Sequence, residues 1–152
     1  MIRNAIAAAA FALLSVALFW GYLRVVGSPG ELAAFWRDSE RVEHLTLIAR
    51  RLRTAYPLLG NKLPQSMDDD FYRKQNMESE WVDPSTRKRY RYGRIDDQRF
   101  WLEADFELDS KELERRGHSL PGPEWRHGPG AHRIVFDVRR EMPYFNSYTD
   151  LK

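Results

Sequence analysis

The hydrophobic and polar positions divide the chain into two unequal parts. From residue 4 to residue 26 almost every position is apolar, and the only charge is Arg24 near the far end. A run of about 20 apolar residues is long enough for a helix to cross the ~30 Å hydrocarbon core of a bilayer. The pattern therefore predicts one transmembrane helix, with residues 1–27 as a membrane anchor.

The residues around this run are typical of a membrane–water interface. Trp20, Tyr22 and Arg24 place two rings and a snorkelling guanidinium near headgroup depth. Residues 28–37 are predicted to form a juxtamembrane linker in which Phe35 and Trp36 lie on the bilayer surface or, equally, belong to the domain core. A cleaved signal peptide is the alternative, but the length of the run and the lack of an Ala-x-Ala site favour a retained anchor.

The residues that follow show the spacing of apolar positions that is typical of a helix. Apolar residues recur at spacings of three and four, which predicts an amphipathic helix with Asp38 or Ser39 as its cap and with Arg41 on a polar face. The apolar stripe consists of Val42, Leu45, Ala49, Leu52 and Tyr56. Pro57, Gly60 and Pro64 end this helix.

Alternation with a period of two then predicts three strands, over residues 89–95, 99–108 and 132–138. Each strand has one apolar face, so the sheet needs a cover on one side, and the stripe of the preceding helix supplies it. The expected fold is α+β, with the helix laid on a small antiparallel sheet and a long loop over residues 117–130. Residues 38–140 form the predicted domain, and residues 141–152 form a tail.

Composition excludes several kinds of chemistry. The chain has no cysteine, which removes disulfides, thiolate nucleophiles, cysteine-ligated zinc and iron–sulfur clusters. A net charge of +2 is too balanced to predict nucleic acid as a partner.

The remaining candidates for catalysis or metal binding are weak. His118, His127 and His132 lack a third ligand at a suitable spacing, and the acidic run at residues 68–70 lacks the calcium-loop pattern. No nucleophile elbow and no phosphate-binding loop is present in the sequence. We therefore expect no enzyme activity, no cofactor, no metal and no small-molecule substrate.

Two segments are candidates for binding a partner. The densest basic patch, which surrounds Tyr90 and Tyr92, consists of Arg87, Lys88, Arg89, Arg91 and Arg94. It suits an acidic surface or anionic headgroups, whereas the alternative is an edge strand kept soluble by its charge. The C-terminal tail adds Tyr144, Phe145 and Tyr148, which dock on a neighbour or fold back on the sheet.

The order of several motifs resembles that of pilin-like proteins. The apolar and amphipathic helices are followed by Leu63-Pro64, by Asp83-Pro84-Ser85-Thr86 and by Tyr90-Arg91-Tyr92. This order is most similar to that of pseudopilin-like C-terminal domains, in which Asp-Pro-x-Thr-Gly precedes Tyr-x-Tyr. The resemblance covers most of the chain from Arg37 to Val138 and extends to a bacterial membrane-anchored subgroup.

The chain departs from this family in two respects. It lacks the prepilin peptidase site, with no Gly and no helix glutamate near its start, which puts filament assembly in doubt. In the subgroup two cysteines occupy the positions of Glu103 and Arg133. By the alternation both side chains face away from the helix, so we expect a cross-strand ion pair there.

These observations together predict an accessory role. The positive-inside rule alone weakly favours a cytoplasmic domain, but the resemblance implies the periplasmic side of the bacterial inner membrane. The expected function is a single-pass, non-catalytic accessory subunit that contacts lipid and other transmembrane subunits of a larger complex, for which respiratory and photosynthetic assemblies are candidates. The alternatives are a minor pseudopilin-like component of a secretion or pilus machine, and a small ligand- or metal-binding domain.

Overall fold

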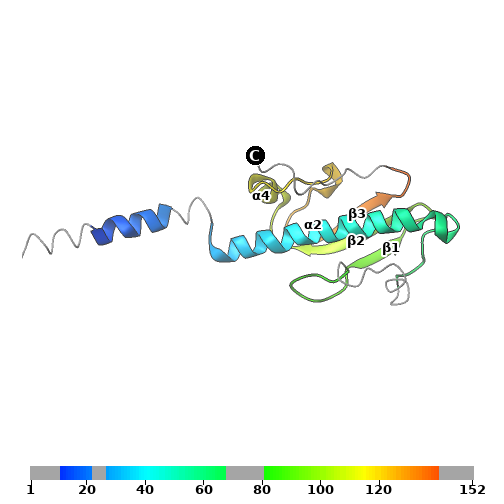
Figure 1. The fold of residues 1–152 in the computed structure, drawn as a ribbon, viewed down its shortest axis with the longest axis horizontal. Helices are drawn as coiled ribbons and strands as arrows, with labels where there is room; N and C mark the ends of the chain where they lie inside the picture. The colour runs from blue at the N-terminus through cyan, green and yellow to red at the C-terminus, as the bar shows by residue number, and fades with distance from the viewer. Residues whose placement is uncertain (1–10, 22–26, 68–80, 141–152) are drawn as a thin grey trace, which may run out of the picture. The chain divides into compact units, whose positions relative to one another are not determined.

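The computed structural model describes residues 11–21, 27–67 and 81–140, in two units that divide after Ala34 (Figure 1). Several sequence predictions lie outside the described residues: most of the apolar run, Tyr22 and Arg24, the acidic run at 68–70, and the tail with Tyr144, Phe145 and Tyr148.

In the first unit, residues 11–21 are helical and every side chain is exposed. The exposed fraction is 72% for Phe11 and 61% for Trp20. No helix within the described ranges combines the length and the hydropathy that a membrane span needs.

The long helix α2 runs from Pro29 to Ala55 without interruption. Ser28 and Glu31 form its N-terminal capping box, in which the Glu31 N–H donates to Ser28 Oγ and the Ser28 N–H donates to Glu31 Oε2. The predicted cap at Asp38 or Ser39 is therefore wrong, and residues 29–37 of the predicted linker belong to this helix. A short 3-10 helix, η1 (Pro57–Leu59), follows α2 and ends at Gly60, whose φ is +70°.

The sheet has three antiparallel strands in the order β1 (Arg91–Arg94), β2 (Arg99–Phe106) and β3 (Gly130–Asp137). The described part is therefore α+β, as the sequence predicts. Along β2 the residues Phe100, Leu102, Ala104 and Phe106 are buried in one cluster with the predicted helix stripe of Val42, Leu45, Ala49 and Leu52. Figure 1 shows α2 lying along this sheet.

The long segment between β2 and β3 is more ordered than the predicted loop. It contains α4 (Ser110–Arg115) and the 3-10 helix η2 (Pro123–Trp125). Trp125 is fully buried and meets Phe136 edge to face, with ring centroids 5.7 Å apart. This segment therefore supplies a core side chain to the sheet.

Candidate functional site

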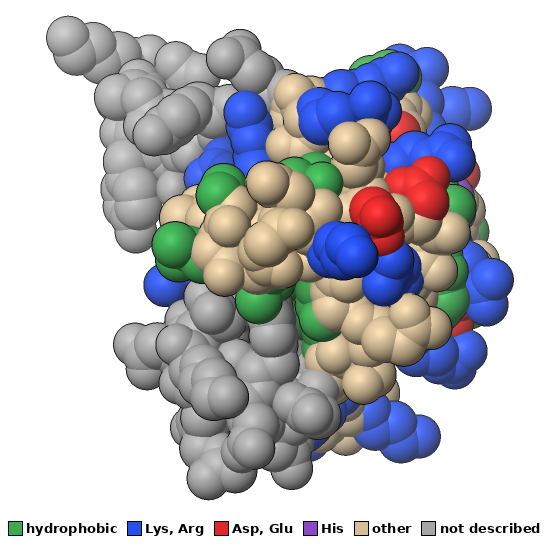
Figure 2. Space-filling model, turned by 90° about the vertical axis from the view of Figure 1, so that its right-hand side faces the viewer, with side chains coloured by type: hydrophobic (Ala, Val, Ile, Leu, Met, Phe, Trp, Pro, Cys, Tyr) green, Lys and Arg blue, Asp and Glu red, His purple; other side chains and the backbone are tan. Residues whose placement is uncertain are grey.

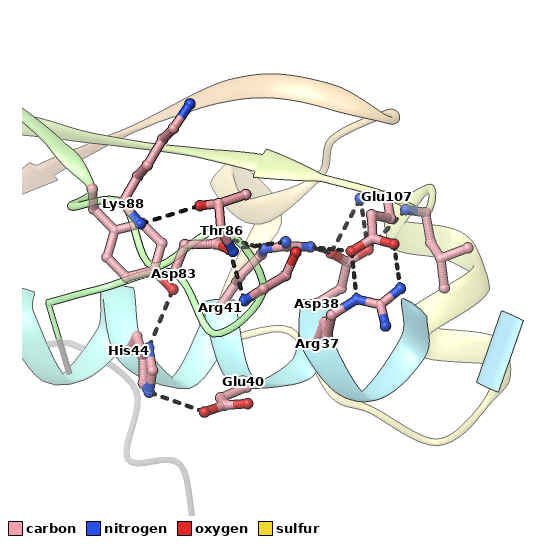
Figure 3. A network of polar contacts seen from close by, with 12 residues as sticks. Arg37, Asp38, Glu40, Arg41, His44, Asp83, Thr86, Lys88 and Glu107 are labelled. Carbon is pink, nitrogen blue, oxygen red and sulfur yellow. Dashed lines mark hydrogen bonds and ion pairs between the residues drawn. The ribbon is translucent and has the colours of Figure 1, made fainter. Parts of the chain in front are cut away.

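The largest concentration of buried charge in the described residues surrounds Arg41 (Figure 3). Its Nε lies 2.5 Å from Asp83 Oδ2, and its Nη1 lies 2.6 Å from Asp38 Oδ1 and 2.9 Å from Glu107 Oε1. The Arg41 side chain is only 2% exposed, so the prediction that it lies on a polar face of the helix is wrong. Its carboxylate partners keep this guanidinium charged within the fold.

Two of these carboxylates, those of Asp38 and Asp83, also accept hydrogen bonds from backbone N–H groups. Asp38 accepts hydrogen bonds from the N–H groups of Glu107 and Leu108, just after β2. Asp83 accepts hydrogen bonds from the N–H groups of Ser85 and Thr86. Arg41 therefore connects α2, the turn before β1 and the end of β2.

The pKa values in this network favour the charged forms. Burial alone would lower the pKa of Arg41, but hydrogen bonds with Asp83, Asp38 and Glu107 outweigh it and raise the pKa. Burial alone would raise the pKa of Asp83, yet hydrogen bonds from Arg41 and the turn backbone lower it. The hydrogen bond from Arg37 is the main reason why the pKa of Glu107 falls to about 2. The network is thus suited to fixing the positions of the connected segments and poorly suited to transferring protons at neutral pH.

The turn held by Asp83 has an unusual backbone. The Arg87 N–H donates to Asp83 O, and the Asp83 N–H donates to Lys88 O. Within this closed turn Arg87 has φ +57°, a left-handed conformation in which a side chain costs about 1 to 2 kcal/mol. Strain of this kind is common where a side chain serves a function.

Replacing Arg87 by glycine should raise the free energy of unfolding by up to about 1 kcal/mol, because glycine adopts positive φ without a steric penalty. Urea denaturation of the full chain in mild detergent measures this change. Arg89→Gly is the matched control and should destabilise the chain, because Arg89 has no positive φ. Equal destabilisation by both variants would contradict the strain argument.

The residues of the predicted basic patch differ in their exposure and contacts. Arg87, Lys88 and Arg89 are exposed on the turn, while Tyr90 is buried in the core. Arg94 instead bends toward Gln65, Asp97 and the backbone O of Asp96. Arg94 is therefore engaged in contacts within the domain, whereas the role of the exposed basic residues in binding a partner stays a prediction.

Phe35 and Trp36, for which the sequence left two interpretations, lie in different environments. Phe35 is buried in the domain core, whereas Trp36 is exposed. Their rings meet edge to face at 5.3 Å.

Glu103 and Arg133 are direct cross-strand neighbours and form an ion pair. Glu103 also pairs with Arg91 of β1, its neighbour on the other side. The carboxylate is nearly buried and both guanidinium groups are exposed, so one acid is shared by two bases.

A double-mutant cycle with Glu103→Ala and Arg133→Ala should give a coupling of about 0.2 to 1 kcal/mol, the usual range for an opposite-charge cross-strand pair. Urea denaturation of the two single variants and the double variant measures it. The same cycle between Glu103 and Arg99, which pairs with Asp96 instead, is the control and should be additive. Additivity of the Glu103 and Arg133 losses would reject the pair as a stabilising contact.

One end of the domain is strongly basic (Figure 2). The C-terminal ends of α2 and β3 lie there, together with the turn between β1 and β2. The turn accepts two backbone hydrogen bonds, from the Leu63 N–H to Asp97 O and from the Val138 N–H to Gln98 O. Its acids are engaged in the ion pairs Arg94–Asp97, Arg99–Asp96 and Arg139–Asp137. Lys62 and Arg140 add further exposed positive charge.

The three histidines do not converge on a metal. His127 is buried and stacks on Phe106 with centroids 3.7 Å apart, and its ring lies 5.8 Å from that of His132. Burial is the main cause that lowers the pKa of both His118 and His127. Among residues 11–21, 27–67 and 81–140, no group of three or more His, Cys, Asp or Glu side chains is placed to hold a metal ion.

Sequence reasoning missed the Arg41 network because two of its three partners are distant along the chain, with Asp83 42 and Glu107 66 positions away. The sequence did contain one sign of this burial. Asp38 and Arg41 lie seven and four positions before Leu45, so they fall on the same face of the helix as the apolar stripe.

Comparison with known proteins finds no matching family model, no matching curated protein and no matching solved structure.

Proposed function

We propose that the chain is a non-catalytic, membrane-anchored accessory subunit whose soluble domain docks onto a larger bacterial membrane complex. The observation that carries the proposal is the helix at residues 11–21, whose large apolar side chains are exposed on all sides. These side chains are Phe11, Leu13, Leu14, Val16, Leu18, Phe19 and Trp20. Such a helix requires lipid or partner helices around it, because water penalises exposed apolar surface.

The buried network around Arg41 supports a docking role because it ties several segments of the domain together. Arg41 holds three carboxylates and, through two of them, the backbone of two further segments. A surface whose supporting residues are fixed in this way loses little entropy when a partner binds. We place the domain on the periplasmic side of the inner membrane, with a pilin-like arrangement and with a respiratory or photosynthetic complex as candidate host.

Two measurements on the tagged full chain test this proposal. In a flotation assay with liposomes at alkaline pH, an anchored chain floats with lipid, and a chain left in the soluble fraction would overturn the anchor. After purification in mild detergent, we expect a defined set of membrane subunits in constant proportion to the chain. Recovery of a lone monomer would overturn the accessory role.

Mass spectrometry of the N-terminus in the same preparation addresses the rival function. An intact start is expected of an accessory anchor. A processed and methylated N-terminus would instead favour the pseudopilin alternative.

A further inference from the structure

The outer face of the sheet, turned away from the core shared with α2, is ordered in rows across the three strands. One row consists of Arg91, Glu103 and Arg133, which are direct neighbours in register. The next row consists of Gly93, Trp101 and Val135. Charged and apolar groups therefore lie side by side on one face of the sheet.

Trp101 is held in one position on this face. A Cβ atom added at Gly93 would clash with Cε2 of the indole, so the ring occupies the space above that glycine. On the β3 side, the Arg133 guanidinium carbon lies 4.3 Å from the ring centroid, a cation–π contact. Glycine weakens a strand interior, and its presence in β1 is explained by the ring that lies on it.

The surroundings of Trp101 are apolar and positively charged. Val135 and Ile95 are 52% and 45% exposed. Arg91 and Arg133 share the single carboxylate of Glu103, so this row keeps one uncompensated positive charge. Tryptophan and arginine are the residues most enriched among those that dominate binding energy at protein interfaces.

We infer that this outer face, centred on Trp101, docks a protein segment that presents a large apolar side chain beside carboxylates. The apolar side chain would cover Trp101 and Val135, and the carboxylates would meet Arg91 and Arg133. Fixed arginines around an immobilised ring suit a protein partner better than lipid headgroups, which are usually met by clusters of flexible basic side chains. The inference rests on the proposed function, because it names the surface through which the domain would contact its host complex.

The test measures binding of a labelled synthetic peptide, in which one phenylalanine is flanked by glutamates, to the full chain in mild detergent. Fluorescence anisotropy reports the affinity. We expect Trp101→Ala and Arg133→Ala each to weaken binding about tenfold or more. A peptide with glutamines in place of the glutamates should bind weakly, and raising salt from about 0.1 M to about 1 M should reduce binding of the acidic peptide.

Matched control variants distinguish binding at this face from non-specific binding of the peptide. Trp36→Ala removes an exposed tryptophan on α2, and Arg126→Ala removes an exposed arginine after η2, so neither should change the affinity. Because Trp101→Ala could disturb folding, Arg91→Glu at an exposed position is the second test variant and should also weaken binding. Equal losses in test and control variants, or no loss in the test variants, would overturn the inference.

Two further experiments test whether anionic lipid or the chain's own tail binds to this face instead. If the face takes anionic lipid, placing the chain in phosphatidylglycerol nanodiscs would abolish peptide binding that persists in phosphatidylcholine nanodiscs. If the chain's own tail covers it, replacing Tyr144, Phe145 and Tyr148 by serine would strengthen binding. Either result overturns the inference. Peptide binding in detergent does not depend on the anchor, so failure here is distinct from failure in flotation.

Discussion

Replacing Arg41 by alanine should lower the free energy of unfolding by about 3 to 5 kcal/mol, the largest effect expected of any charged residue in the described part of the chain. The substitution leaves Asp38 and Asp83 buried without their common cation. An uncompensated buried charge is costly because water no longer solvates it and no opposite charge replaces the water. Urea denaturation of the full chain in mild detergent measures the loss.

Arg37→Ala is the matched control on the same helix. Arg37 pairs with Glu107, but both side chains are about one third exposed, so water screens the pair. The expected loss is about 0 to 1 kcal/mol. A loss for Arg41→Ala no greater than that for Arg37→Ala would contradict the buried network.

A compensated variant tests the mechanism. Arg41→Met combined with Asp38→Asn and Asp83→Asn removes the cation and two of its three anions together. Replacing a buried ion network by neutral groups is often far less costly than breaking it. We therefore expect the triple variant to be more stable than Arg41→Ala.

The same network predicts a dependence on acid. The pKa values of Asp83 and Glu107 are lowered in the fold, to about 2 for Glu107. A lowered carboxyl pKa contributes stability above the pKa of the unfolded chain, near 4, and that contribution is lost as pH falls through the folded value. Wild-type stability should thus decline between about pH 4 and 2, and Arg41→Ala should show a shallower decline because the carboxyl pKa values rise.

Replacing Trp125 by alanine should also cost about 3 to 5 kcal/mol, the usual range for a buried tryptophan in a core. Trp125 lies in η2 and contacts Phe136 of β3, so its loss opens a cavity under the sheet and frees the segment between α4 and β3. Urea denaturation measures the stability, and limited proteolysis at residues 117–129 measures the release of the segment. Both should change together.

Arg126→Ala, one position further on, provides the comparison, because Arg126 is exposed. Its stability and its proteolysis pattern should match those of the wild type. If Trp125→Ala left the proteolysis rate unchanged, another contact would have to hold the segment.

The elements themselves could be predicted from local patterns. The period of two placed Phe100, Leu102 and Phe106 on one face of β2, and the period of about 3.6 placed Val42, Leu45 and Leu52 on one face of α2. The same alternation placed Glu103 and Arg133 on a common face, but it did not fix the register, and their direct pairing was expected only from the resemblance to the cysteine-bearing subgroup. The start of α2 was missed because the Ser28–Glu31 capping box directly follows the apolar run.

The sequence by itself therefore determined the long helix, the three strands, the α+β class and the core face of each strand, since these depend on periodicities within a few residues. Only the tertiary structure decided that Arg41 is buried, that Trp125 joins the core and that the Trp101 ring lies over Gly93. Each of these depends on a partner from another element: Asp83 for Arg41, Phe136 for Trp125 and Gly93 for Trp101. A local pattern does not encode such partners, because the burial of a side chain is settled by what packs against it.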